Sequence, residues 1–247
     1  MSINQYLDST YLKTPAQAGI SNSDTLDMVH KLTQEAIDNE IYAVMIRPDY
    51  VRSVRALLEE RKSNVVLGTV IGFHEGTNDL NEKLREAQRA IADGAEELDF
   101  VINYEAFKKG EIEKVKEEVE TVTSIVLREA KVVKWIIETA ALTDNQIVEL
   151  TQLIRDIVIN KLGEEYAPRV FVKSSTGFYR TPNDEPNGAN EHVIKLMLAN
   201  AGPLPVKASG GVRTVEEAEK MIALGVKRIG TSSALAIVKG EKATGDY

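Results

Sequence analysis

The sequence of 247 residues contains no cysteine, so it can form no disulfide bond, no thiolate metal site and no cysteine nucleophile. Its three histidines, His30, His74 and His192, are scattered and lack the spacing of metal ligands. We therefore expect no metal ion in this protein.

The sequence also lacks an apolar run long enough to span a membrane. Residues 1–5 show no basic region followed by an apolar stretch, which argues against a signal peptide. The formal net charge of −8 argues against nucleic acid or an anionic membrane as the main partner, although local basic sites for small anions remain possible. These absences predict a cytoplasmic protein.

Short apolar stretches alternate with helical patterns along the whole chain. Eight stretches are predicted strands: 6–10, 41–46, 65–71, 97–102, 131–137, 169–173, 204–208 and 227–230. Helical patterns follow at 23–39, 49–61, 79–92, 111–130, 143–161, 191–200, 214–224 and 232–239. Alternation of this kind predicts a parallel sheet with crossovers, and eight units in this length fit a closed (β/α)8 TIM barrel. No Pro/Ser/Gly-rich linker divides the chain, so we expect one α/β domain over residues 1–247.

A lysine ends the sixth predicted strand. Lys173 follows the apolar residues Phe171 and Val172 and precedes the small residues Ser-Ser-Thr-Gly at 174–177. A buried lysine is costly unless it is paired or used, and burial lowers its pKa toward the neutral amine that attacks carbonyls. Lys173 is therefore a candidate Schiff-base nucleophile. The alternative interpretation is a surface or salt-bridged lysine.

Other charged residues occupy the same ends of predicted strands, namely Asp8, Asp99, Lys134 and Lys207. Working residues of such barrels lie at the carboxyl ends of the strands, so three lysines and at least one carboxylate are expected to converge inside. Nearby cations keep a lysine neutral, and a carboxylate beside a second lysine can relay protons. The residues alone do not decide which lysine is the nucleophile. Lys134 could equally be a barrel-lining charge paired with Asp8 or Asp99.

Small residues follow the seventh and eighth predicted strands. Gly210 and Gly211 free the backbone to turn, and Thr214 can cap the next helix. Residues 230–233, Gly-Thr-Ser-Ser, repeat the pattern of a strand, small residues and a helix start. Loops after strands seven and eight form the phosphate site of many such barrels, so a phosphate site is expected here.

Together these motifs resemble the deoxyribose-phosphate aldolase family, which consists of class I (Schiff-base) aldolases with a (β/α)8 fold. The matching segments run in one order nearly end to end, at 7–10, 97–101, 134–139, 172–177, 207–214 and 230–233. The resemblance implies reversible cleavage of 2-deoxy-D-ribose 5-phosphate to acetaldehyde and D-glyceraldehyde 3-phosphate, in the catabolism of deoxyribose phosphate. It also implies no metal or organic cofactor and a homo-oligomer, a dimer or tetramer.

By the same resemblance, Lys173 is the Schiff-base lysine, and Asp99 and Lys207 form the proton-relay pair. The resemblance further implies two groups of residues. The substrate and phosphate would be held by Thr176, Gly177, Gly210, Gly211, Ser232 and Ser233, with supporting roles for Asp8, Thr10 and Lys134.

The chain departs from the family pattern in two places. Met45 stands where some relatives carry cysteine, so any role of a thiol there is lost. The loop 178–190 is longer than is usual in the family and contains Arg180, Asp184 and Glu185; we expect Arg180 to add a positive charge near the phosphate.

Two alternative functions are left open. One is a Schiff-base aldolase with a different aldehyde acceptor, which the altered loop would permit. The other is a non-catalytic phosphosugar-binding barrel, against which the intact set of Asp99, Lys173 and Lys207 argues.

Overall fold

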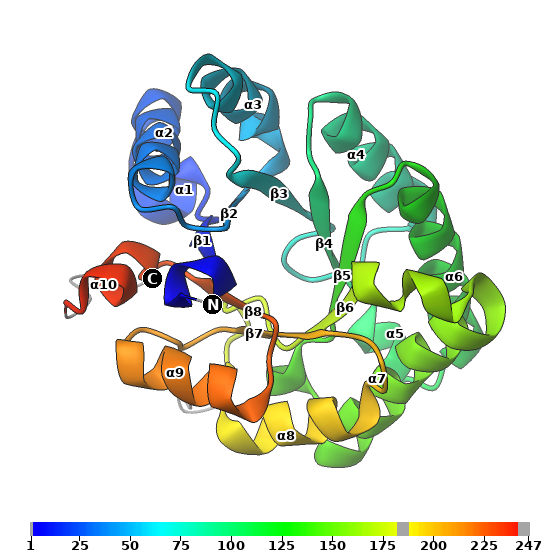
Figure 1. The fold of residues 1–247 in the computed structure, drawn as a ribbon. Helices are drawn as coiled ribbons and strands as arrows, with labels where there is room; N and C mark the ends of the chain where they lie inside the picture. Colours follow the sequence, from blue (N-terminus) through cyan, green and yellow to red (C-terminus); the bar gives the residue numbers. More distant parts are fainter. Residues whose placement is uncertain (1, 182–187, 242–247) are drawn as a thin grey trace.

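The protein forms a closed barrel of eight parallel strands, paired in chain order, with β8 returning to β1 (Figure 1). The computed structural model describes residues 2–181 and 188–241, so Asp184 and Glu185 of the loop 178–190, and the tail that ends at Tyr247, lie outside the described residues. The strands are β1 (Leu7–Tyr11), β2 (Ala43–Ile46), β3 (Val66–Ile71), β4 (Glu97–Val101), β5 (Val132–Ile136), β6 (Val170–Lys173), β7 (Val206–Ser209) and β8 (Arg228–Thr231).

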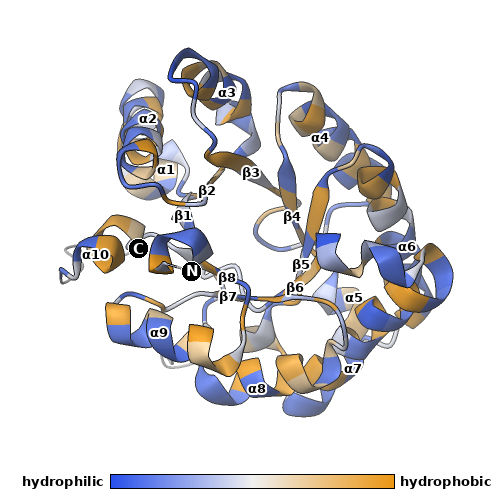
Figure 2. Ribbon diagram, in the orientation of Figure 1, coloured by the Kyte–Doolittle hydropathy of each residue, from blue (hydrophilic) through white to orange (hydrophobic). Residues whose placement is uncertain are grey.

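Helices surround the barrel as an outer layer (Figure 1). Hydrophilic and hydrophobic residues alternate along these helices, as expected when one side packs on the strands and the other meets water (Figure 2). They are α1 (Pro15–Ala18), α2 (Asn22–Asp38), α3 (Val51–Glu60), α4 (Leu80–Ala92), α5 (Tyr104–Lys108), α6 (Ile112–Arg128), α7 (Asp144–Ile157), α8 (Glu191–Asn200), α9 (Val215–Leu224) and α10 (Ala234–Lys239). None of the helices in the described parts of the chain is both long and apolar enough to cross a membrane.

Side-chain alternation along the strands separates the apolar core from the barrel interior. Phe100 and Trp135 are fully buried, and their rings lie 5.4 Å apart on neighbouring strands. Trp135 points toward α6, where its indole N–H donates to the Thr123 hydroxyl at 3.0 Å. Because successive strand residues face opposite sides, Asp99 and Lys134 face into the barrel. The same register that builds the core therefore delivers charged side chains to the interior.

The predicted (β/α)8 barrel is confirmed, with every predicted strand present within two residues of its expected limits. One helix start was wrong. α2 is capped by Ser21 rather than Ser23, because Ser21 and Asp24 form a capping box in which each side chain accepts the other's backbone N–H. The short helices α1 and α5 were not predicted, and the pattern at 143–161 ends as a helix at Ile157 and continues as a π-helical turn, Val158–Leu162.

Candidate active site

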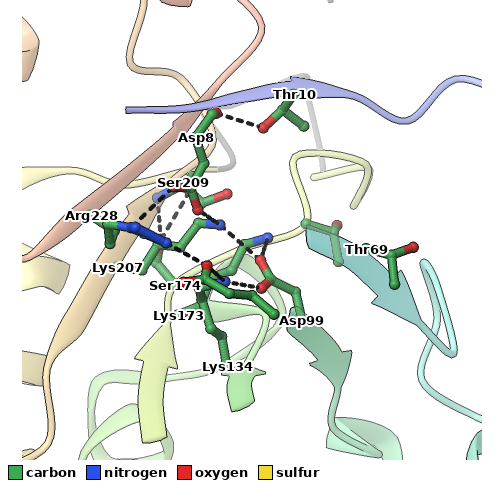
Figure 3. A network of polar contacts seen from close by, with 12 residues as sticks. Asp8, Thr10, Thr69, Asp99, Lys134, Lys173, Ser174, Lys207, Ser209 and Arg228 are labelled. Atoms are coloured by element: carbon green, nitrogen blue, oxygen red, sulfur yellow. Dashed lines mark hydrogen bonds and ion pairs between the residues drawn. The ribbon is translucent and has the colours of Figure 1, made fainter. Parts of the chain in front are cut away.

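Asp99 lies at the centre of a group of lysines inside the barrel (Figure 3). Its Oδ1 accepts a hydrogen bond from Lys134 Nζ at 2.8 Å, and its Oδ2 accepts hydrogen bonds from Lys173 Nζ and Lys207 Nζ, each at 2.8 Å. The strand register explains the convergence, since Asp99 pairs with Lys134 and Lys173 pairs with Lys207. The structure thus brings together the four residues that alternation placed in one interior.

The environment of Lys173 favours the neutral amine. Its side chain is only 3% exposed, and this burial lowers its pKa to about 8, with Lys207 and Lys134 acting in the same direction against Asp99. Lys134 shows the opposite result. Burial lowers its pKa too, but the carboxylates of Asp99, Glu97 and Asp8 outweigh this and raise it. Near neutral pH, Lys173 therefore supplies far more free amine than an ordinary lysine.

Asp99 is held in its charged form by the three lysines. Burial alone would raise the pKa of this carboxyl, but Lys134, Lys173 and Lys207 hold it well below its usual range. Because Lys173 and Lys207 bind the same oxygen, a proton can pass between either amine and a substrate through one shared carboxylate.

Asp8 extends the network on the other side of Lys207. Its Oδ2 accepts a hydrogen bond from Lys207 Nζ at 2.5 Å, and its Oδ1 accepts one from Arg228 Nε at 3.1 Å. Arg228 also donates to Glu97, which pairs with Lys134 at 2.6 Å. Glu97 and Arg228 were given no role from the sequence. The available signal was their phase, because Glu97 is two residues before Asp99 on β4 and both begin strands that line the interior.

A cavity of about 650 Å³ opens beside Lys173. It brings together six of the residues predicted for the site, namely Thr10, Thr176, Gly177, Gly210, Gly211 and Ser232. Gly210 and Gly211 have φ values of 89° and 83°, in the left-handed region that favours glycine. Backbone N–H groups in such a turn are suited to binding an anion.

Two residues near the expected phosphate site differ in their placement. Ser232 is exposed and lines the cavity, whereas Ser233 is buried, and its N–H donates to the Thr231 hydroxyl at 2.9 Å. The helix that follows, α10, has only six residues. Phosphate contact by Ser233 therefore stays a prediction, and the glycine loop and Ser232 are the better-placed donors. Gly230 leaves room for the Lys207 side chain, because a Cβ at this position would lie 3.1 Å from Lys207 Cε.

The loop after Lys173 is fixed by its own hydrogen bonds. Ser174 donates to Ser209 O and accepts from Ser209 N, both at 2.9 Å. The buried Glu138 carboxylate accepts from the hydroxyls of Ser175 and Thr176 and from Thr176 N. Burial raises the pKa of Glu138, with these hydrogen bonds opposing it. Glu138 was part of a recognised motif but was given no role; it sets the position of Thr176 at the cavity wall.

The structure shows where two residues that depart from the family pattern lie, Arg180 in the loop after β6 and Met45 in β2. Arg180 lines a second cavity of about 520 Å³ with His74, Tyr104 and Phe178, not the cavity beside Lys173. The structure therefore does not place the Arg180 side chain in the cavity expected to bind the phosphate. Met45 is 1% exposed and packs against Gly68, where a Cβ would lie 2.2 Å from its sulfur, so it is a core residue.

Comparison with known proteins shows that the chain is similar to aldolases. The DeoC/LacD family aldolase model matches residues 5–240. A deoxyribose-phosphate aldolase of Lactiplantibacillus plantarum is 39% identical over 96% of this chain and 99% of its own length. One from Thermococcus gammatolerans is 38% identical over 98% of this chain and 97% of its own.

Solved structures give the same result. A putative deoxyribose-phosphate aldolase from Coccidioides immitis superposes with a TM-score of 0.81 at 32% identity, covering 96% of this chain and 84% of the other. A tetrameric deoxyribose phosphate aldolase from Aeropyrum pernix superposes with a TM-score of 0.76 at 29% identity, covering 96% and 89%. With a family match over nearly the whole barrel and near full-length relatives, the chain belongs to the DeoC/LacD family of aldolases.

Proposed function

We propose that this protein is a class I aldolase that reversibly cleaves 2-deoxy-D-ribose 5-phosphate to acetaldehyde and D-glyceraldehyde 3-phosphate through a Schiff base on Lys173. One observation carries the proposal. Lys173 is a buried amine whose pKa is lowered to about 8, it shares Asp99 Oδ2 with Lys207, and it faces a cavity lined by a glycine loop. The names of the Lactiplantibacillus plantarum and Thermococcus gammatolerans relatives agree with this substrate.

The first step is attack by the neutral Lys173 amine on C1 of the open-chain sugar. A C–N bond forms, the amine loses a proton and the carbonyl oxygen gains one, which gives a carbinolamine. Protonation of its hydroxyl then expels water and leaves a protonated Schiff base. Asp99 and Lys207 can move these protons. Asp99 accepts a hydrogen bond from the Lys173 amine at 2.8 Å, and Lys207 donates to the same Asp99 oxygen at 2.8 Å.

The second step breaks the C2–C3 bond. A base removes the proton of the C3 hydroxyl, C3 becomes the aldehyde carbon of glyceraldehyde 3-phosphate, and the electron pair of the broken bond forms an enamine with the Schiff base. Protonation at C2 and addition of water then release acetaldehyde and restore Lys173. The water expelled in the first step is thus matched by the water consumed here.

We assign the phosphate to the part of the cavity lined by Gly210, Gly211 and Ser232, whose backbone N–H groups and hydroxyl can donate to it. Thr176 and Gly177 line the same cavity. Thr10 lines the same cavity, and its hydroxyl donates to Asp8 O at 2.9 Å. We assign Asp8, Thr10 and Lys134 supporting roles, in keeping the charges and the cavity wall in place.

We also propose that the protein is a homo-oligomer. The support is the Aeropyrum pernix relative, whose structure is described as tetrameric. Analytical ultracentrifugation tests this, and a monomer at micromolar concentration would contradict it.

A retro-aldol assay with coupled detection of glyceraldehyde 3-phosphate tests the reaction, with fructose 1,6-bisphosphate and ribose 5-phosphate as comparison sugars. Cleavage of 2-deoxyribose 5-phosphate well above both comparison sugars is expected. Covalent capture by acetaldehyde and borohydride without that cleavage would indicate a Schiff-base aldolase with another acceptor. No capture at all would leave a phosphosugar-binding barrel and overturn the proposal.

A further inference from the structure

Buried charges inside the barrel form a closed ring in which cations and carboxylates alternate. Lys207 joins Asp99 to Asp8, and Lys134 joins Asp99 to Glu97 at 2.6 Å. Arg228 closes the ring because it donates both to Asp8 and to Glu97. Around the ring the order is Asp99, Lys134, Glu97, Arg228, Asp8, Lys207 and back to Asp99 (Figure 3 labels all but Glu97).

The ring is electrically balanced and almost sealed from water. Its six members come from β1, β4, β5, β7 and β8, and each is at most 4% exposed. Charges this deeply buried are tolerated only when paired, and three cations face three carboxylates. The pKa directions of Asp8 and Arg228 agree with a fully charged ring. For Asp8, burial raises the pKa but Arg228 and Lys207 more than offset it; for Arg228, burial lowers the pKa but Asp8 and Glu97 more than offset it.

Lys173 stands outside this balance. It reaches the ring through Asp99 alone, whereas Lys134 and Lys207 each contact two carboxylates. A protonated Lys173 would add one uncompensated positive charge to a neutral, buried cluster. The ring therefore favours the neutral amine at Lys173 more strongly than at Lys134 or Lys207.

We propose that Glu97 and Arg228 are positioning residues that set the protonation of Lys173 through the ring, acting by way of Lys134, Asp8, Lys207 and Asp99. The inference rests on the proposed function only in taking Lys173 as the nucleophile. Neither residue is part of the cavity lining, so their effect is electrostatic rather than a contact with substrate.

The charge balance fixes the sign of each effect. Removing the Glu97 charge leaves the ring with one net positive charge, which disfavours protonated Lys173 and lowers its pKa. Removing the Arg228 charge leaves one net negative charge and raises the pKa. Removing both restores a neutral ring. A purely structural role for either residue predicts no such opposite signs.

The other charged or titratable groups near these residues are constant in the test. Asp99 of β4, Lys134 of β5 and Lys207 of β7 face Lys173 directly, and Glu138, after β5, interacts with it electrostatically. The Tyr42 ring lies 3.6 Å from the Arg228 guanidinium carbon. None of these is altered in the variants below.

The test compares Glu97→Gln, Arg228→Gln and the double variant, with Glu97→Asp and Arg228→Lys as controls that keep the charge. The readout is the pH midpoint for capture of Lys173 by a 1,3-diketone, which forms an absorbing enaminone with a neutral lysine and needs no aldolase activity. The lower-pH limb of kcat/KM for unphosphorylated 2-deoxyribose gives a second midpoint, undisturbed by phosphate ionisation.

We expect the midpoint to fall by about one pH unit in Glu97→Gln and to rise by about one in Arg228→Gln, the size expected for a unit charge removed from the same buried cluster. The double variant should return close to the wild-type value. It should also fold, since removing a buried ion pair as a whole is often tolerated. Shifts of the same sign, or none, in the two single variants would overturn the proposal.

A second experiment uses the wild-type protein and so does not depend on the folding of any variant. With ¹⁵N-labelled lysine, the Nζ signal of Lys134 should stay that of an ammonium from about pH 6 to 10, while Lys173 titrates. Titration of Lys134 in that range would overturn the ring. Absence of any diketone adduct on wild-type Lys173 would instead refute the proposed function, so the two failures are distinguishable.

Discussion

Lys83 and Lys173 are both buried and both have lowered pKa values, yet of these two Lys173 alone is suited to chemistry. Lys83 lies in the helix layer, is fully buried and donates to Gly76 O at 2.6 Å, to Val101 O at 2.7 Å and to Glu118. Burial lowers its pKa, with Glu118 opposing the shift. All three N–H donors of its ammonium are used, and it ties the loop after β3 and the end of β4 to α6.

Lys173 differs in its partners and its access. Within residues 2–181 and 188–241, the hydrogen bond found for its Nζ is the one to Asp99, and the side chain lines a cavity of about 650 Å³. A lowered pKa therefore does not identify a nucleophile by itself. What distinguishes the site is an amine with unused hydrogen-bonding capacity, facing space for a carbonyl, beside a carboxylate that a second lysine shares.

The largest expected difference between the two lysines is in activity. Lys173→Met should lose at least about 10⁴-fold in kcat, the scale of losing a covalent nucleophile. Lys83→Met should keep covalent capture by acetaldehyde and borohydride, because it leaves the Asp99 cluster untouched. Steady-state kinetics and intact mass measure both. Capture lost equally in the two variants would remove the distinction.

Removing Lys207 is expected to have the next largest effect. Lys207→Leu deletes both a relay partner and a cation beside Lys173, so kcat should fall by about 10²- to 10⁴-fold. With less positive charge nearby, the protonated form of Lys173 is less disfavoured and its pKa rises above about 8. The lower-pH limb of the rate profile should therefore move to higher pH. An active variant with an unmoved limb would count against the role of Lys207.

The two lysines should also differ in sign for stability. Lys83→Met leaves Glu118 buried without its cation and should lower the free energy of unfolding by about 3–5 kcal/mol. Lys173→Met leaves Asp99 with two lysines, and it removes a group whose folded pKa lies below its unfolded pKa. The unfolded state binds the extra proton between about pH 8 and 10.4, so wild-type Lys173 destabilises the protein below that window.

Below about pH 8 the lowered pKa of Lys173 thus costs up to about 3 kcal/mol, which Lys173→Met would recover in part, less its lost packing. The stability gain should shrink as pH rises from about 8 to 10.4. Urea unfolding at several pH values measures it. A constant difference across that range would contradict the assignment of a lowered pKa to Lys173.

The smallest predicted effect concerns the phosphate. Gly211→Glu should raise KM for 2-deoxyribose 5-phosphate by about 10- to 100-fold, because it places bulk and a like charge beside the dianion. Gly211→Ala is the matched control: its φ of 83° strains both variants, but a Cβ meets no atom within 4 Å. Free 2-deoxyribose should be much less affected. Equal losses on both sugars in Gly211→Glu would mean that the phosphate binds elsewhere.

The barrel and the convergence of Asp99, Lys134, Lys173 and Lys207 could be predicted because both follow from periodicity. Strand alternation fixes which face a side chain takes, and parallel strands bring their carboxyl ends to one edge. The start of α2 was harder, because Ser21 and Ser23 are both plausible caps and only the reciprocal hydrogen bonds with Asp24 decide between them.

The closure of the ring could not be predicted from the sequence. Arg228 and Glu97 are 131 positions apart, and they lie on β8 and β4, which are not neighbouring strands of the barrel. Glu138 was missed for another reason. Its backbone φ is 53°, a conformation uncommon for a non-glycine residue, and it turns the carboxylate onto the Thr176 loop in a way that strand phase does not foretell.

The most direct test of the central claim is the position of the covalent intermediate. The wild-type protein is incubated with acetaldehyde, reduced with borohydride, digested and mapped by mass spectrometry. We expect one ethyl adduct, on Lys173. An adduct on Lys134 or Lys207 in place of Lys173 would contradict the claim.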